Sequence, residues 1–146
     1  MSKKIINWGI IGTGKAAHNF AKAFALTKCG KLIAIGSRDK ERAKNFAQEF
    51  NLVFNFSSYS QLANSSEVDI VYIATPNSCH MENALLCLNS GKSVLIEKPF
   101  ATNIQDAKTL IDLAIKNNLF LMEAIWTRFI PAFNKIEQLI NSGEIN

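Results

Sequence analysis

The sequence predicts an α/β fold, a doubly wound (Rossmann) parallel sheet that forms a dinucleotide-binding domain. Short apolar runs alternate six times with segments of helical periodicity, and short connections join them. Two central runs, 70–73 and 94–96, are apolar throughout, which is typical of parallel strands buried on both faces. The first run leads into the turn Gly12-Thr13-Gly14, which opens a helix. Together these features indicate the doubly wound class.

Bulk properties narrow the possible functions of a chain of 146 residues, which is long enough for one domain with a core. The net charge of +4 comes from scattered basic residues rather than a stripe, which argues against a nucleic-acid partner. No apolar run approaches the ~20 residues of a membrane span. The first apolar run is too short for a secretory leader, so we expect a cytoplasmic location. The three cysteines lack CxxC spacing and predict reduced thiols without a metal site: Cys29, Cys79 and Cys87.

In the first half of the chain, strands are expected at 5–11, 32–35 and 52–56, followed by a short helix and loop at 57–67. The helix after each of the first two strands has an apolar face at helical spacing: Ala17, Phe20, Ala21 and Phe24, then Ala43, Phe46, Ala47 and Phe50. Asp39 is expected to cap the second helix, and Asn51 to end it.

In the second half, strands are expected at 69–74, 93–96 and 120–123, and a loop at 126–129. Gly91 is expected to end the first helix of this half in the left-handed conformation. Thr102 and Gln105 predict a capping box at the start of the next helix. Pro131 opens the last helix. The apolar faces of these three helices are Met81, Ala84, Leu85 and Leu88; Ala107, Leu110, Ile111, Ala114 and Ile115; and Ile136, Leu139 and Ile140.

The turn after the first strand has the spacing Gly12-x-Gly14-x-x-Ala17, which is weak alone but gains weight between a strand and a helix. Gly12 permits a tight turn, Gly14 lets the backbone approach a pyrophosphate, and Ala17 allows close packing of helix and strand. The helix amino terminus would then bind the phosphates. The alternative is an ordinary turn made of small residues.

The end of the second strand favours NADP(H) over NAD(H). An NAD enzyme usually carries an acid at this place, whereas this chain has Ser37 and Arg38. A hydroxyl and a guanidinium bind a 2′-phosphate that an acid would repel. Asp39 is one residue further on and is expected to serve as the helix cap. The alternative is that Arg38 is a solvent-exposed side chain that binds no ligand, which the sequence does not distinguish.

Glu97-Lys98-Pro99 follows the strand at 93–96, at the edge where open α/β sheets bind ligands. Pro99 stops the strand and stiffens the backbone beside Lys98, and a cis bond there would aim the amine into the cleft. A positioned ammonium stabilises charge that develops on a substrate oxygen during hydride transfer. Lys98 is therefore the candidate catalytic residue.

Five motifs, in this order, make the chain resemble the glucose–fructose oxidoreductase, inositol dehydrogenase and rhizopine-catabolism (Gfo/Idh/MocA) family of NAD(P)-dependent oxidoreductases. The last motif is similar to the dihydrodiol dehydrogenase and glucose–fructose oxidoreductase branch. The motifs are Trp8-Gly9-Ile10-Ile11-Gly12-Thr13-Gly14, Ser37-Arg38, Ala74-Thr75-Pro76-Asn77-x-x-His80, Gly91-Lys92-x-Val94-Leu95-Ile96-Glu97-Lys98-Pro99, and Met122-Glu123-Ala124-x-Trp126-x-Arg128-Phe129.

The resemblance implies a role for each matching position. The cofactor would contact Gly12, Thr13, Gly14, Ala16, Ala17, Ser37, Arg38, Thr75, Pro76, Asn77, His80, Glu97, Lys98, Trp126 and Arg128. Glu97 and Lys98 would reach the nicotinamide ribose and the substrate oxygen, and Trp126 and Arg128 the nicotinamide end. Some positions keep a structural alternative: His80 as a cap or packing residue, and Trp126 and Arg128 as packing against the last helix. His18 is expected to be a surface or packing residue.

The resemblance also implies a domain division, with an NAD(P)-binding domain at 1–125 and a linker and helix at 126–146. Family members continue into a C-terminal α+β domain that binds substrate, supplies a proton donor or acceptor, and usually forms the dimer. We expect a sugar, polyol or diol substrate in the full-length enzyme, which would act on CH–OH or CH–CH groups. The 146 residues alone are expected to be inactive and to self-associate through the surface left by the absent domain.

Two other interpretations stay open at this point. The chain could be a non-enzymatic dinucleotide-binding module, a redox sensor or scaffold, which would use the same glycine turn without Lys98. It could also be a structural α/β domain that binds no ligand.

Overall fold

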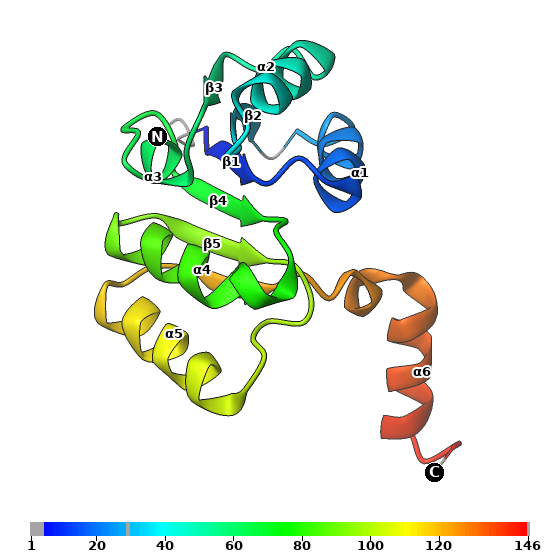
Figure 1. Ribbon diagram of the computed structural model, residues 1–146. Coiled ribbons are helices and arrows are strands. Elements are labelled where there is room, and N and C mark those ends of the chain that lie inside the picture. Colours follow the sequence, from blue (N-terminus) through cyan, green and yellow to red (C-terminus); the bar gives the residue numbers. More distant parts are fainter. Residues whose placement is uncertain (1–4, 29, 146) are drawn as a thin grey trace.

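The computed structural model describes residues 5–28 and 30–145, so Cys29 and Asn146 lie outside the described residues. One six-stranded sheet runs through the molecule in the order β3-β2-β1-β4-β5-β6, and every neighbouring pair is parallel (Figure 1). This order confirms the doubly wound class. The strands are β1 Asn7–Ile11, β2 Lys31–Gly36, β3 Phe54–Phe56, β4 Ile70–Ile73, β5 Ser93–Ile96 and β6 Leu121–Glu123.

Helices cover the two faces of the sheet unequally, and each face has its own core. On one face, α1 (Lys15–Phe24) and α2 (Lys40–Glu49) pack on alternate residues of β1, β2 and β4, among them Ile10 and Tyr72. The other face is covered by three helices: α3 (Tyr59–Ala63), α4 (His80–Asn89) and α5 (Ile104–Lys116). Successive strand residues point to opposite faces, so the central strands are buried on both sides.

Burial of β5 differs from the prediction at one residue. Val94 and Ile96 face the core under α4 and α5 and are fully buried. Leu95 points to the other face, at the margin of the core around α1 and α2, and is only half-buried. The expectation of burial on both faces is therefore wrong at Leu95, because α1 and α2 cover mainly the other half of the sheet.

The predicted helix boundaries are confirmed at three places. Asp39 caps α2, since its carboxylate accepts the backbone N–H groups of Glu41 and Arg42 at 3.0 and 3.1 Å. Asn51 and Gly91 follow the ends of α2 and α4 with φ of 53° and 73°. Both residue types adopt the left-handed conformation at low cost.

The cap of α5 lies one residue later than the sequence predicts. Asn103, not Thr102, is the N-cap: its Oδ1 accepts the N–H of Asp106 at 2.9 Å, and its Nδ2 donates to the Asp106 carboxylate at 2.8 Å. Asparagine ranks above threonine as an N-cap, and the reciprocal pair with Asp106 replaces the box expected with Gln105.

Several apolar residues are more exposed than their pattern suggests. Ile5 and Ile6 precede β1 instead of extending it, and Phe120 lies just before β6. On α5, Leu110 and Ala114 are buried, whereas Ile111 and Ile115 are 46% and 73% exposed. These two isoleucines border an apolar groove against β6 instead of facing the sheet.

The chain beyond β6 extends away from the sheet (Figure 1). Trp126–Phe129 forms the short 3₁₀ helix η2 instead of the expected loop, and Pro131 opens α6 (Pro131–Asn141) as predicted. None of the residues described for α6 is buried, and its apolar residues Ile136 and Ile140 are about half exposed. Among the described residues, no helix combines the length and the apolar character that crossing a membrane requires.

Candidate dinucleotide site

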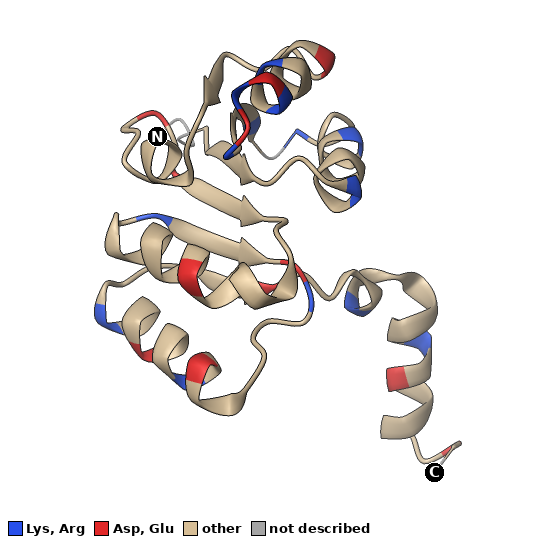
Figure 2. Cartoon of the chain, viewed as in Figure 1, with Lys and Arg blue, Asp and Glu red and all other residues tan. Residues whose placement is uncertain are grey.

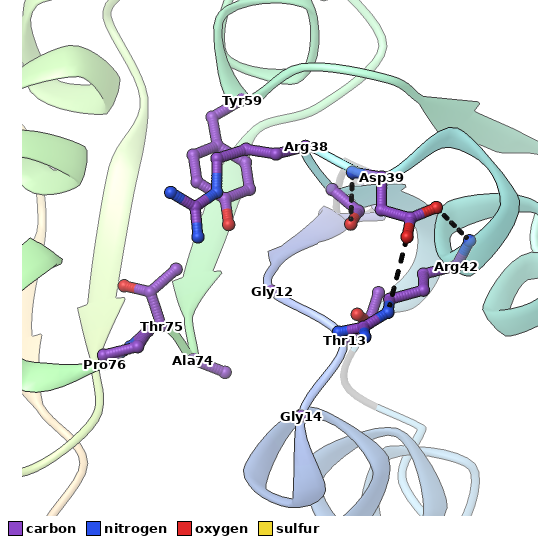
Figure 3. A pocket seen from close by; sticks show the side chains of 11 residues that line it. Gly12, Thr13, Gly14, Arg38, Asp39, Arg42, Tyr59, Ala74, Thr75 and Pro76 are labelled. Carbon is purple, nitrogen blue, oxygen red and sulfur yellow. Dashed lines mark hydrogen bonds and ion pairs between the residues drawn. The ribbon is translucent and has the colours of Figure 1, made fainter.

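A cleft of about 400 Å³ opens at the carboxyl ends of β1, β2 and β4 (Figure 3). Parallel strands bring the loops that follow them to the same edge of the sheet, so segments far apart in sequence meet there. The cleft is lined by Gly12, Thr13, Gly14, Ser37, Arg38, Asp39, Arg42, Tyr59, Ala74, Thr75 and Pro76. Seven of the positions expected to bind a cofactor are therefore brought together: Gly12, Thr13, Gly14, Ser37, Arg38, Thr75 and Pro76.

The glycine turn has the geometry expected for close approach of a ligand to the backbone. Gly12 has φ of 102°, and a Cβ on it would lie 2.7 Å from the carbonyl oxygen of Ala74. Gly14 is the N-cap residue of α1, where no side chain accepts a hydrogen bond from the helix amides. A Cβ on Gly14 would meet nothing within 4 Å. Ala17 is fully buried beneath the turn, whereas Ala16 is half-buried and does not line the cleft.

The end of β2 forms the positively charged side of the cleft. Ser37 is buried, and its Oγ accepts the N–H of Asp39 at 3.1 Å. Besides capping α2, the Asp39 carboxylate lies 3.5 Å from Nε of Arg42. Blue and red ribbon segments alternate where β2 passes into α2 (Figure 2). Asp39 is thus engaged by its own helix, and the guanidinium of Arg38 is the group that extends across the cleft toward Thr75 (Figure 3).

Four lining residues are absent from the cofactor-binding candidates: Asp39, Arg42, Tyr59 and Ala74. The sequence singles out Asp39 as a helix cap and Ala74 as part of a family motif, but it assigns no role to Arg42 or Tyr59. Arg42 could have been identified from the sequence, because it lies in the first turn of the helix that Asp39 caps and is therefore close to the end of β2. Tyr59 begins α3, and only the tertiary structure brings it opposite the glycine turn.

The loop after β4 is held from behind by two buried side chains. Thr75 Oγ1 accepts a hydrogen bond from Nδ2 of Asn83 at 3.0 Å. His80 is fully buried, with Nε2 at 2.9 Å from the carbonyl oxygen of Thr75 and Nδ1 at 2.8 Å from that of Pro99. His80 therefore lies behind the cleft lining, whereas Asn77 is exposed at the start of the 3₁₀ helix η1 (Asn77–Cys79).

Glu97 and Lys98 occupy the next strand end along the sheet, outside the lining of this cleft. The N–H of Glu97 donates to the carbonyl of Ile73 at 3.0 Å, which ties the end of β5 to the end of β4. The Lys98–Pro99 peptide bond is cis, and the Lys98 side chain is exposed. The order β2-β1-β4-β5 thus arranges Arg38, the glycine turn, Thr75 and Lys98 in one row along the edge.

The remaining candidates lie apart from this row. Trp126 and Arg128 belong to η2 beyond β6 and do not line the cleft, and Trp126 is 68% exposed. His18 joins α1 to α2 as a packing residue, with Nε2 at 3.2 Å from the Glu49 carboxylate and its ring against Phe46. No cluster of three or more histidine, cysteine or carboxylate side chains suited to a metal occurs within the described ranges.

Comparison with known proteins agrees with this geometry. Residues 6–125 match the family GFO_IDH_MocA, described as "Oxidoreductase family, NAD-binding Rossmann fold". A curated relative, "Trans-1,2-dihydrobenzene-1,2-diol dehydrogenase" from Xenopus tropicalis, is 39% identical over 140 residues, 94% of this chain. "D-xylose 1-dehydrogenase (NADP(+))" from Hypocrea jecorina is 38% identical over 152 residues, 96% of this chain. The chain spans only 42% and 39% of these two relatives.

Similar solved structures also match nearly all of this chain but less than half of their own length. A 3-ketoreductase from Actinomadura kijaniata, in complex with NADP and TDP-benzene, superposes with a TM-score of 0.91 at 30% identity, over 98% of this chain and 44% of its own. The apo scyllo-inositol dehydrogenase from Lactobacillus casei gives a TM-score of 0.90 at 25% identity, over 100% of this chain and 44% of its own.

Proposed function

The chain belongs to the GFO_IDH_MocA family of oxidoreductases with a NAD-binding Rossmann fold, and from this premise we propose that it binds NADP(H) in particular. It would form the cofactor half of an enzyme that transfers hydride between nicotinamide and a hydroxyl or carbonyl carbon of a sugar, polyol or diol. The observation that carries the proposal is the single cleft that unites the uncapped amino terminus of α1 with Ser37, Arg38 and Arg42.

The β1–α1 turn fits a pyrophosphate. The helix amides are not capped by a side chain, and the open space at Gly14 lets a phosphate reach them. Free N–H groups and the positive end of the helix dipole both favour an anion at this point.

The β2–α2 turn fits a 2′-phosphate better than two free ribose hydroxyls. Asp39, the only acid among the residues that line the cleft, is already the cap of α2 and the partner of Arg42. Two guanidinium groups can donate charge-assisted hydrogen bonds to a phosphate. One curated relative carries NADP(+) in its name and one similar solved structure is a complex with NADP, which supports the same preference.

The Lys98 ammonium would supply the electrostatic part of the reaction. Bound nicotinamide would exchange a hydride with the substrate carbon. Lys98, at the same sheet edge, would stabilise negative charge on the substrate oxygen. The relatives named as diol and xylose dehydrogenases and as a ketoreductase support a hydroxyl or carbonyl substrate. None of them favours the non-enzymatic alternative.

Fluorescence titrations with NADPH and NADH test the cofactor preference. We expect tighter binding of NADPH, and Arg38→Gln or Arg42→Gln should weaken NADPH binding roughly tenfold or more, since a hydrogen bond to a charged group contributes about 1.5–3 kcal/mol. NADH binding should change little.

Lys44→Gln is the matched control, because it removes one positive charge from the exposed side of α2 without touching the cleft. It should leave the ratio of the two affinities unchanged. Equal binding of NADPH and NADH by the wild-type chain would contradict the NADP preference, and binding of neither would contradict the proposed function.

A further inference from the structure

The Glu97-Lys98-Pro99 turn is anchored by its backbone and not by the lysine side chain. Among the described residues, the Lys98 ammonium makes no hydrogen bond or ion pair, and its side chain is exposed. Its position therefore depends on the groups that hold its neighbours in the chain.

Tyr72 holds the residue before the lysine. Tyr72 pairs with Leu95 across β4 and β5, so Glu97, two residues further on, points to the same face of the sheet. The Tyr72 hydroxyl donates a short hydrogen bond to Oε1 of Glu97. The other carboxylate oxygen, Oε2, accepts the backbone N–H of Lys98 at 3.2 Å. One carboxylate thus connects a buried phenol to the amide of Lys98.

The phenol is itself fixed in place. Only 2% of Tyr72 is exposed, and its ring stacks on Phe20 of α1, with centroids 3.9 Å apart and planes 16° from parallel. Burial, followed by the hydrogen bond to Glu97 and its charge, raises the pKa of Tyr72 well above its ordinary value. The hydroxyl therefore stays protonated and remains a donor throughout the working pH range.

Two further contacts hold the residues after the lysine. Nδ1 of His80 lies 2.8 Å from the Pro99 carbonyl oxygen, and the Glu123 carboxylate accepts the N–H of Phe100 at 2.7 Å. Residues on both sides of Lys98 are consequently tied to β4, α4 and β6.

We propose that Tyr72 is a positioning residue that acts through Glu97, orienting the Glu97-Lys98 turn toward the nicotinamide half of the cofactor. This inference rests on the proposed binding of NADP(H) and assigns a role to a buried residue that does not line the cleft. The Tyr72 hydroxyl contacts Glu97 after β5, whereas Arg38 follows β2 on the other side of the glycine turn. Removal of the hydroxyl should therefore affect the nicotinamide half of the ligand and not the adenosine half.

The test compares NADPH with adenosine 2′,5′-bisphosphate, a probe that carries the adenosine half but no nicotinamide. Tyr72→Phe keeps the ring that stacks on Phe20 and removes only the hydroxyl. It should weaken NADPH binding roughly threefold to tenfold, the factor expected for one hydrogen bond, and leave binding of the bisphosphate unchanged.

Two further variants separate positioning from a general structural role. In a Glu97→Ala background, Tyr72→Phe should cause no additional loss, because the two residues act as one unit. Tyr59→Phe makes the same chemical change in the cleft beside Arg38, and any loss that it causes should affect both ligands equally.

Three results would overturn the inference: equal weakening of both ligands by Tyr72→Phe, no weakening of either, or losses that add to those of Glu97→Ala. A wild-type chain that binds neither ligand contradicts the proposed function itself, and this inference with it. Wild-type binding of both ligands followed by any of the three results contradicts the role of Tyr72 alone.

Discussion

Helices α1 and α2 begin at the same edge of the sheet, and only one of them has a side-chain cap. Each has ten residues and follows a neighbouring strand. At α2, the Asp39 carboxylate accepts two backbone N–H groups of the first turn. At α1, the N-cap residue is Gly14, which has no side chain to accept the backbone N–H groups of the first turn. The amino terminus of α2 is thus satisfied within the chain, whereas that of α1 is left open to a ligand.

Other helices support this contrast. Ser58 and Asn103 cap α3 and α5 as Asp39 caps α2. Helices α4 and α6 also lack a side-chain cap, but α4 continues from η1 and α6 begins with Pro131, which has no N–H to satisfy. Glycine at an N-cap costs only a few tenths of a kcal/mol relative to a side-chain cap, so α1 can leave its first amides open to an anion at little cost in stability.

Gly12→Ala should have the largest effect on the α1 turn. The new Cβ would lie 2.7 Å from the Ala74 carbonyl oxygen, on a residue with φ of 102°. Strain of this kind costs about 1–3 kcal/mol before any displacement of the loop after β4 is included. We expect the free energy of unfolding in urea to fall by at least that amount, and NADPH binding to be lost.

Gly14→Ala is the matched control for this change, since its Cβ meets nothing within 4 Å and φ is −83°. Its stability should stay within about 1 kcal/mol of the wild type. The methyl group nevertheless occupies the approach to the helix amides, so NADPH affinity should fall. Unchanged affinity in both variants would show that the turn does not contact the phosphates.

Asp39→Ala should have an intermediate effect, confined to α2. Loss of the cap is expected to lower the free energy of unfolding by about 0.5–2 kcal/mol, measured by urea denaturation. Asp39→Asn retains a capping oxygen and should stay close to the wild type in stability, because asparagine and aspartate cap equally well. A similar loss in both variants would mean that the charge, and not the cap, stabilises α2.

Gly14→Ser should have the smallest effect on stability and would make α1 resemble α2. Serine at an N-cap is favoured over glycine by only a few tenths of a kcal/mol, so the unfolding free energy should rise slightly. The hydroxyl would compete for the amides that we assign to the pyrophosphate, so NADPH affinity should fall in the same titration. If Gly14→Ser is more stable than the wild type and binds NADPH equally well, the open amino terminus of α1 does not bind the pyrophosphate.

Local features of the site could be predicted from the sequence because neighbouring residues produce them. The Gly12-to-Ala17 spacing, the cap at Asp39 and the left-handed Asn51 and Gly91 each depend on a few consecutive residues. The shift from Thr102 to Asn103 shows the limit even there, since both are good caps and the pairing with Asp106 decides between them.

Contacts between distant segments could not be predicted in this way. Tyr59 lines the cleft, Asn83 holds Thr75, and Tyr72 reaches Glu97 across 25 positions of sequence. These residues belong to no recognisable functional motif. A tyrosine in a strand or an asparagine in a helix can have many structural roles, so its residue type alone does not indicate a site.

Periodicity and turn chemistry are local, so the residues alone predict the alternation of strands and helices, the glycine turn and the basic end of β2. Three features become visible only in the fold: the order of the strand ends, the place of His80 behind the cleft, and the contact of Tyr72 with the residue before Lys98. The order in which strands pair, and the burial that follows from it, depend on the packing of the whole chain.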